Sequence, residues 1–257
     1  MKNSITVIYE DKDFLALNKP AGILVHEARS IKHEAKNNER KNATSFRIHA
    51  PGTLVDWVLE NYPEIKGVGD DLENRPGIVH RLDKETSGVL LVAKNQITFD
   101  YFKKLFQNRE IKKIYLALVY GKVEPKKGVI RKVIRLKPGT TKRTVWRGKM
   151  EKEAVTEYKV IKFLKLEDKN NNGQFFSFLE VFPKTGRTHQ IRVHLASISH
   201  PIVGDELYGP KNNSLGSGRQ FLHAASLEFV TIDGQRLRVE SGFPQELENT
   251  IKKLKAA

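Results

Sequence analysis

The stretch "GIVHRLDKETSGVLLVAK", Gly77 to Lys94, places Arg81 and Asp83 shortly before a run of branched apolar residues. The run "VLLVA" is typical of a buried strand. An aspartate at the edge of such a strand commonly accepts hydrogen bonds from the backbone of a turn, and Asp83 could do no more than that. The alternative is that the strand holds a functional carboxylate in place, and the rest of the chain has to decide between the two.

The composition indicates a folded protein with an anionic partner. The chain has 257 residues, of which 39% are apolar, and a formal net charge of +15, which favours polyanions such as nucleic acid. Most of the excess lies between Lys103 and Lys149, where sixteen basic residues stand against Glu110 and Glu124, with aromatic residues interleaved. Such a surface can bind phosphates and unstacked bases. A basic face that is merely solvated is an equal alternative.

Several classes of protein are excluded by what the sequence lacks. The chain contains no cysteine, which rules out disulfides, thiolate zinc sites and cysteine nucleophiles. Its first residues have no apolar core of signal-peptide length, and no apolar stretch approaches the roughly twenty residues of a membrane span. We therefore expect a cytoplasmic protein that is not associated with a membrane.

The pattern of short apolar runs predicts a strand-rich fold. Besides "VLLVA", strands are expected in "ITVIYE", "FLALNKP", "KKIYLALVYG", "GVIRKVIRL", "EAVTEYKVIKFL" and "FFSFLEVF". Thr53 and Asp56 offer a capping-box start for a helix over 54–62. A second helix is expected over 95–108, with Ile97 on its apolar stripe. Many strands with few helices between them predict an α+β fold with a mixed or antiparallel sheet.

Two further clusters could carry chemistry. In "TGRTHQIRVH", Arg187 and Arg192 bracket a histidine and a glutamine, and a helix is expected to begin there. A purely structural interpretation would have Thr188 cap this helix and an arginine pair with some acid. In "KKIYLALVYG", Tyr115 faces a cleft or solvent if its two neighbours face the core, because side chains alternate along a strand. An ordinary strand tyrosine explains that position equally well.

A metal site would have to use the histidines of the second half of the chain. Their spacings match no zinc signature, and neither cysteine nor an HExxH pattern is present. We therefore expect no metal. The histidines concerned are His189, His194, His200 and His223.

These clusters occur in one order with their neighbours intact. The segments are "LNKPAGILVH", "HRLDKETSGVLLVAK", "KKIYLALVYG", "TGRTHQIRVHLASISHPIVGDELYG" and "RQFLHAASLEF". Together they resemble the RluA family of RNA pseudouridine synthases, from about Ile5 to at least Phe229. The resemblance implies an α+β pseudouridine synthase catalytic fold, with a mixed, mainly antiparallel central sheet flanked by helices, and no cofactor.

The resemblance also implies roles for individual residues. Asp83 would be the catalytic aspartate and Arg187 its partner. Arg81 would help to open the RNA stack, and Tyr115 would pack on the target uracil. The implied activity is the isomerisation of uridine to pseudouridine at specific positions of structured RNA, ribosomal or transfer RNA. Two alternatives stay open: a noncatalytic RNA-binding protein that retains the fold, and a nucleosidase that releases free uracil.

The charged segment after Glu27 and the early first strand bear on the domain organisation. The segment from Glu27 to Asn42 is charged and nearly without large apolar residues, so we assign about 27–50 to an exposed loop or insertion. Many family relatives carry a small N-terminal RNA-binding domain, for which the strands near residue 5 leave no room. We expect one catalytic domain over 1–257, with no separate N-terminal RNA-binding domain, acting as a monomer.

Overall fold

One long sheet forms the centre of the computed structural model, which describes residues 4–27, 52–140, 142–167 and 173–257. Within these residues the sheet has ten strands in the order β1-β2-β3-β11-β4-β10-β9-β13, with β12 beside β11 and β5 beside β9. A second, three-stranded sheet has the order β7-β6-β8. The elements in chain order are β1 (Thr6–Glu10), β2 (Phe14–Lys19), α1 (Leu54–Asn61), a 3-10 helix η1 (Pro63–Gly67), β3 (Ser87–Ala93), α2 (Gln96–Asn108), β4 (Lys112–Tyr120), β5 (Lys127–Arg131), β6 (Ile134–Leu136), β7 (Arg143–Thr144), β8 (Lys149–Lys152), β9 (Val155–Leu166), β10 (Gln174–Pro183), α3 (Gln190–Ala196), β11 (Leu222–Val230), β12 (Arg236–Glu240), α4 (Gln245–Lys252) and β13 (Lys255–Ala256).

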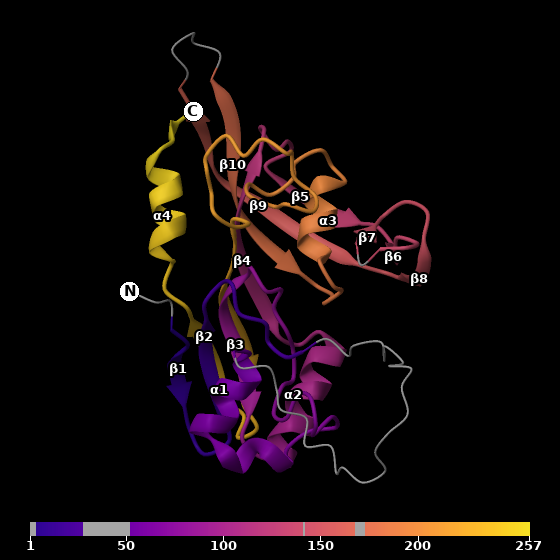
Figure 1. The fold of residues 1–257 in the computed structure, drawn as a ribbon, viewed down its shortest axis with the longest axis vertical. Coiled ribbons are helices and arrows are strands. Elements are labelled where there is room, and N and C mark those ends of the chain that lie inside the picture. The colour runs from indigo at the N-terminus through magenta and orange to yellow at the C-terminus, as the bar shows by residue number, and fades with distance from the viewer. Residues whose placement is uncertain (1–3, 28–51, 141, 168–172) are drawn as a thin grey trace, which may run out of the picture.

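The predicted fold class is confirmed. Among the described strands β3 and β11 pair in parallel, and the other pairs are antiparallel. The sheet is therefore mixed and mainly antiparallel, with helices on its faces (Figure 1). In Figure 1 the lower part holds β1 to β3 with α1 and α2, and the upper part holds β9 and β10 with α3 and α4. The strand β4 runs between the two parts.

The continuous apolar run of β3 reflects burial on both faces of the sheet. Every residue of β3 is buried. Leu90 packs in the cluster that contains the apolar side of α1, whereas its neighbour Leu91 packs with Phe102 of α2. Because side chains alternate along a strand, a strand covered on both sides needs apolar residues at every position.

The first two helices begin where they were expected. Thr53 and Asp56 form a complete capping box at the start of α1, and α1 ends at Asn61. The helix over 95–108 is also confirmed, but one position of its apolar stripe is wrong. Ile97 is 73% exposed, and Phe99 faces the core together with Phe102 and Leu105. The reason is aromatic packing, because the Phe102 ring meets the rings of Phe14 and Phe229 edge to face.

Two predictions about the organisation of the chain stay predictions. The loop expected at about 27–50 lies, apart from Glu27, outside the described residues. The single-domain organisation over 1–257 stays a prediction. In the described part of the chain, no helix is long and apolar enough to cross a membrane.

Candidate active site

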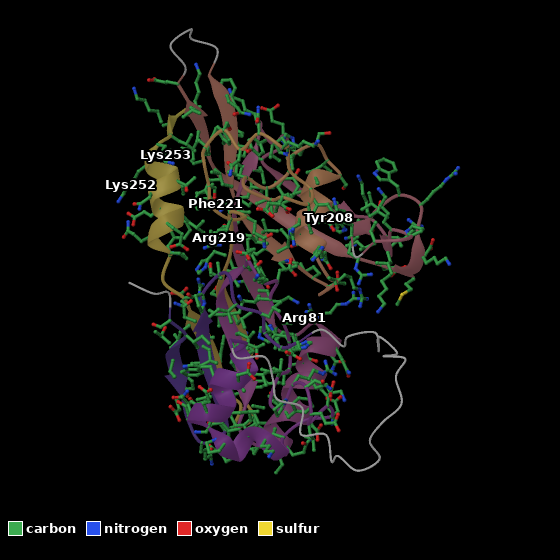
Figure 2. All side chains as sticks on the ribbon, in the orientation of Figure 1. Arg81, Tyr208, Arg219, Phe221, Lys252 and Lys253 are labelled. Atoms are coloured by element: carbon green, nitrogen blue, oxygen red, sulfur yellow. The ribbon has the colours of Figure 1, made fainter. Side chains whose placement is uncertain are left out.

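The structure brings the four predicted site residues to one cleft. Its volume is about 490 Å³, within the size range of small-molecule sites. The lining comes from three stretches that are far apart in sequence, together with Leu222, and it includes Arg81, Asp83, Tyr115 and Arg187. Figure 2 shows Arg81 between the lower and upper parts of the molecule, beside α2.

Asp83 lies in a loop before β3, and a buried lysine holds one side of that loop. Lys19, at the end of β2, is fully buried. Its Nζ donates to the carbonyl oxygens of Pro20 and Ile23 at 2.8 Å and of Lys84 at 3.0 Å. All three ammonium hydrogens therefore have an acceptor, and one acceptor is the carbonyl oxygen of Lys84, the residue after Asp83. Burial lowers the pKa of Lys19 to about 7.

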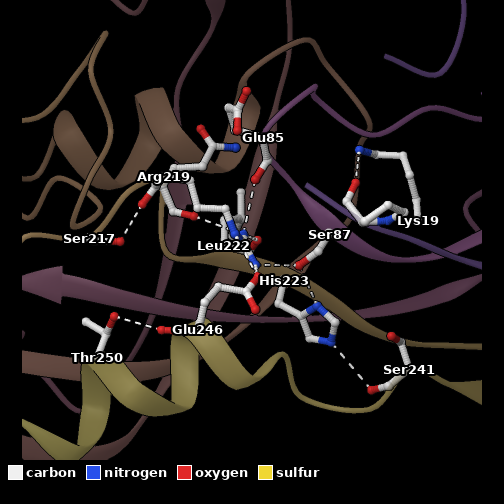
Figure 3. A network of polar contacts seen from close by, with 12 residues as sticks. Lys19, Glu85, Ser87, Ser217, Arg219, Leu222, His223, Ser241, Glu246 and Thr250 are labelled. Atoms are coloured by element: carbon white, nitrogen blue, oxygen red, sulfur yellow. Dashed lines mark hydrogen bonds and ion pairs between the residues drawn. The ribbon is translucent and has the colours of Figure 1, made fainter. Parts of the chain in front are cut away.

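A second buried network holds the other side of the loop (Figure 3). Arg219 donates to the Glu85 carbonyl at 3.1 Å and to the Ser87 hydroxyl at 2.9 Å, and it pairs with Glu246 of α4. The Ser87 hydroxyl also lies 2.9 Å from Nδ1 of His223, whose Nε2 faces the Ser241 carbonyl. The loop that carries Asp83 is thus bonded to the end of β2, to β11 and to the C-terminal helix.

A glycine sets the distance between β3 and β11. Gly88 pairs with Ala224 in the parallel ladder. A Cβ added at Gly88 would lie 2.1 Å from the Ala224 carbonyl oxygen, and its φ of 119° is one that other residues rarely adopt. In the next ladder Ala224 pairs with Tyr115 of β4. This row of three residues fixes the strand that follows Asp83 relative to the strand that carries Tyr115.

The prediction that Arg187 pairs with Asp83 is wrong, because the partner is Arg192. Arg192 Nη1 lies 3.0 Å from Asp83 Oδ2. Its Nε and Nη2 bind the two oxygens of Asp205 at 2.7 and 2.8 Å. The side chain of Asp83 is 19% exposed, that of Arg192 8%, and that of Asp205 is fully buried. Burial acts to lower the pKa of Arg192, but Asp205 and Asp83 outweigh it and raise that pKa.

The position at which α3 begins explains why Arg192, and not Arg187, meets Asp83. Arg187 lies in the loop before the helix, and the Nε of Arg187 donates to the Glu153 carbonyl at 3.0 Å. Gln190 fixes this loop, because its Oε1 accepts from the Arg187 backbone at 3.0 Å and its Nε2 donates to Val155. The structural interpretation with Thr188 as a cap is also wrong, since the capping position is His189 in a left-handed conformation without a side-chain cap.

Tyr208 connects the arginine to the small sheet. Arg192 lies over its ring at 5.2 Å from the centroid, a cation-π contact. The Tyr208 hydroxyl accepts the Arg143 backbone N–H of β7 at 2.8 Å and lies 3.0 Å from Nδ1 of His189. Figure 2 shows Tyr208 beside α3, toward the three-stranded sheet. Burial lowers the pKa of His189, so this ring is neutral at pH 7.

Tyr115 presents a neutral phenol to the cleft. Burial raises its pKa, and the charge of Asp83 raises it further. Its ring packs against two apolar clusters of the core, one with residues of β4 and β10 and one with residues of β3 and α1, so its position is fixed from two sides. The side chain can therefore offer a flat apolar surface beside the carboxylate.

The histidines that were considered as metal ligands form hydrogen bonds with protein groups. His194 lies between Thr156 and the Lys132 carbonyl, and His200 faces the Tyr120 carbonyl. Burial lowers the pKa of His194 to about 4. No group of metal-ligating side chains that could hold an ion is found among the described residues.

The comparison with known families decides the assignment. The model of the family described as RNA pseudouridylate synthase matches residues 13–197, a span that includes Asp83, Tyr115 and both arginines of the α3 region. The chain belongs to the RNA pseudouridylate synthase family. The resemblance to its RluA branch is confirmed by relatives named ribosomal large subunit pseudouridine synthase D.

Pseudouridine synthases of several bacteria are similar over most of the chain. An uncharacterized RNA pseudouridine synthase of Aquifex aeolicus is 40% identical over 82% of this chain and 58% of that protein. Ribosomal large subunit pseudouridine synthase D of Borreliella burgdorferi is 35% identical over 94% of this chain and 66% of that protein. The chain thus spans about three fifths to two thirds of these two relatives.

A solved pseudouridylate synthase domain shares the fold. Human RNA pseudouridylate synthase domain containing 1 superposes with a TM-score of 0.73 at 23% identity, covering 99% of this chain and 89% of that one. The pseudouridine synthase fold predicted from the motifs is confirmed.

Sequence reasoning assigned no individual role to four residues that build this site. Lys19, Arg192, Asp205 and Arg219 all lie inside the quoted motif segments, and all four are buried. Buried charges are rare unless they are paired, so the position of Arg192 between Ile191 and Val193 was an available signal, whereas Asp205 and Arg219 have glycine and polar neighbours and offered none. The roles of Arg81, Tyr115 and Arg187 toward a substrate stay predictions.

Proposed function

We propose that this chain is an RNA pseudouridine synthase that isomerises uridine within structured RNA, with Asp83 as the catalytic residue. One observation carries the proposal. The Asp83 carboxylate lies in the cleft, is paired with the buried Arg192, and shares the cleft with Tyr115. Family membership gives this geometry its chemical meaning.

The reaction needs a carboxylate and no cofactor. The bond from uracil N1 to ribose C1′ breaks, the uracil turns, and its C5 joins the same C1′. C5 then loses its proton and N1 gains one, so atoms and electrons balance within one nucleotide. An ionised carboxylate can attack C1′ covalently, as in retaining glycosidases, or remove a ribose proton so that a glycal forms. Arg192 binds Oδ2 of Asp83, and no described residue forms a hydrogen bond with Oδ1, which would serve either route.

The remaining cleft residues suit a uridine that has left its helix. A base inside a duplex is out of reach, so the nucleotide has to be extruded. Arg81 is exposed at the cleft and close in sequence to Asp83, where it can brace the vacated stack. The ring of Tyr115 can hold the detached uracil while it turns.

We further propose large-subunit ribosomal RNA as the substrate. Relatives at 33–35% identity carry the name ribosomal large subunit pseudouridine synthase D. The basic stretch from Lys103 to Lys149 would attract the RNA backbone, with an affinity that falls as salt rises. The protein would act as a monomer in the cytoplasm, where its RNA is found, and transfer RNA is the alternative substrate.

The test is product analysis with a matched inactive variant. Purified protein is incubated with total RNA from cells that lack the gene, and pseudouridines are mapped by carbodiimide modification and mass spectrometry. We expect new pseudouridine in ribosomal RNA with the wild type and none with Asp83→Asn. Its circular dichroism spectrum and RNA retention should match the wild type.

Each other outcome favours a different function. RNA binding without conversion would indicate the noncatalytic RNA-binding alternative. Free uracil would indicate a nucleosidase. Full activity of Asp83→Asn would overturn the proposed mechanism.

A further inference from the structure

Lys113 is a cation of the cleft that has no part in holding Asp83. It lies on β4 two residues before Tyr115, so the two side chains share one face of the strand. Both line the cleft. Lys112, the preceding residue, has the opposite facing and pairs with Glu228 at 3.4 Å.

The surroundings of Lys113 are short of negative charge. In the part of the chain that the structure describes, its ammonium has no hydrogen bond or ion pair, and Asp83, already paired with Arg192, is the acid among the described lining residues. The charged groups that act on Lys113 are Arg109, after α2, and Lys184, after β10, which itself pairs with Glu157. His80 is near as well, but burial and Lys113 lower its pKa to about 3, so it is neutral.

This arrangement is unfavourable for a free cation and favourable for a bound anion. Burial, together with the charges of Arg109 and Lys184, lowers the pKa of Lys113 to about 8. A partly buried charge without a counter-ion is destabilising, and an anion that reaches it gains a charge-assisted hydrogen bond in a site with little water. Arg109 lines the cleft as well, and it is held at the C-cap of α2, where its backbone N–H bonds to the last turn of the helix.

We propose that Lys113 and Arg109 bind a phosphate group adjacent to the target uridine. The proposal rests on the proposed function, because a uridine that enters the cleft from an RNA chain brings a phosphate on each side of its ribose. With the base on Tyr115 and the ribose at Asp83, a flanking phosphate is the anion that can reach the same wall. The site would hold the nucleotide by its backbone and leave the base free to turn, which a reaction that detaches the base requires.

The test compares small ligands that differ by one phosphate. Binding of uridine, uridine 5′-monophosphate and uridine 3′-monophosphate is measured by NMR titration at pH 7. We expect one monophosphate to bind roughly tenfold tighter than uridine, the value of a hydrogen bond between charged groups. Lys113→Met should remove this preference, and Lys113→Arg should retain it.

Lys112→Met is the matched control, because it removes one positive charge from the same strand on the opposite face. It should leave the preference for the monophosphate unchanged. A pH series adds a readout that a structural role would not move. Above pH 8 Lys113 loses its charge, so the preference of the wild type should fall between pH 7 and 9, whereas that of Lys113→Arg should persist.

Equal binding of uridine and both monophosphates, including no binding at the highest soluble concentration, would overturn the proposal. So would an equal loss of preference in Lys112→Met. Ligand binding requires no turnover, so this experiment can fail while pseudouridine still forms, and it can succeed if the proposed activity is absent. Circular dichroism of each variant shows that the loss is not a loss of fold.

Discussion

Asp83 and Arg192, 109 residues apart in sequence, form a 3.0 Å ion pair in the wall of the cleft. The same guanidinium binds Asp205 with two hydrogen bonds. Asp205 Oδ1 in turn accepts the backbone N–H groups of Leu207 and Tyr208 at 2.9 and 3.1 Å. The arginine is thus positioned from behind by a fully buried acid, and it presents one remaining N–H edge to Asp83.

Replacing the Arg192 guanidinium by a lysine ammonium should slow the reaction strongly without unfolding the protein. Lysine cannot bind Asp205 with two parallel hydrogen bonds and reach Asp83 as well. For Arg192→Lys we expect the single-turnover rate of pseudouridine formation to fall by roughly 100-fold or more, as displaced catalytic groups do. Arg187→Met is the control, with a smaller loss, because Arg187 bonds to a carbonyl rather than to Asp83. A larger loss in Arg187→Met would contradict this assignment.

Gly88→Ala should destabilise the fold severely. The added Cβ would collide with the Ala224 carbonyl, and the backbone there has positive φ. We expect the free energy of unfolding, measured with guanidinium chloride, to fall by about 3 kcal/mol or more. Gly234→Ala is the control, because Gly234 also has a positive φ, 87°, but has open space where the Cβ would lie, so the substitution strains the backbone without a collision. Equal effects of the two substitutions would show that close packing of β3 on β11 is unimportant.

Lys19→Met should weaken the loop that carries Asp83. The substitution removes the donor of three carbonyl oxygens in a fully buried place, which we expect to lower the free energy of unfolding by about 2 kcal/mol. Because Lys84 is one of the three, the rate of pseudouridine formation should fall as well. Hydrogen exchange of the residues around Asp83 reports the loosening directly. Unchanged exchange there would refute the role of Lys19.

The stability should fall on acidification through a histidine. Burial lowers the pKa of His223 to about 4, below the unfolded value of about 6.5. As the pH falls from 6.5 to 4, the unfolded chain takes up a proton that the folded chain excludes, so stability is lost in this window and the loss levels off below pH 4. We expect His223 to account for up to about 3 kcal/mol of it. In His223→Asn the slope of unfolding free energy against pH should be smaller, and an unchanged slope would argue against this cause.

The local structure and the membership of the cleft could be predicted from sequence. Short apolar runs marked the strands, and Thr53 with Asp56 marked the start of α1, because these signals depend on neighbours along the chain. The motif order pointed to Asp83, Arg81, Tyr115 and Arg187, and the structure gathers all four in one cleft.

Only the tertiary structure decided which charges meet. "GRTHQIRV" contains two arginines of equal chemistry, and the choice of Arg192 over Arg187 depends on where α3 begins and on which of its faces meets the loop before β3. The same holds for Phe99 instead of Ile97 in α2, and for the contact of Lys19 with the loop that carries Asp83. Periodicity specifies that a helix has an apolar face. The rotation of that face and the pairing of buried charges depend on contacts between distant segments, which form only when the chain has packed.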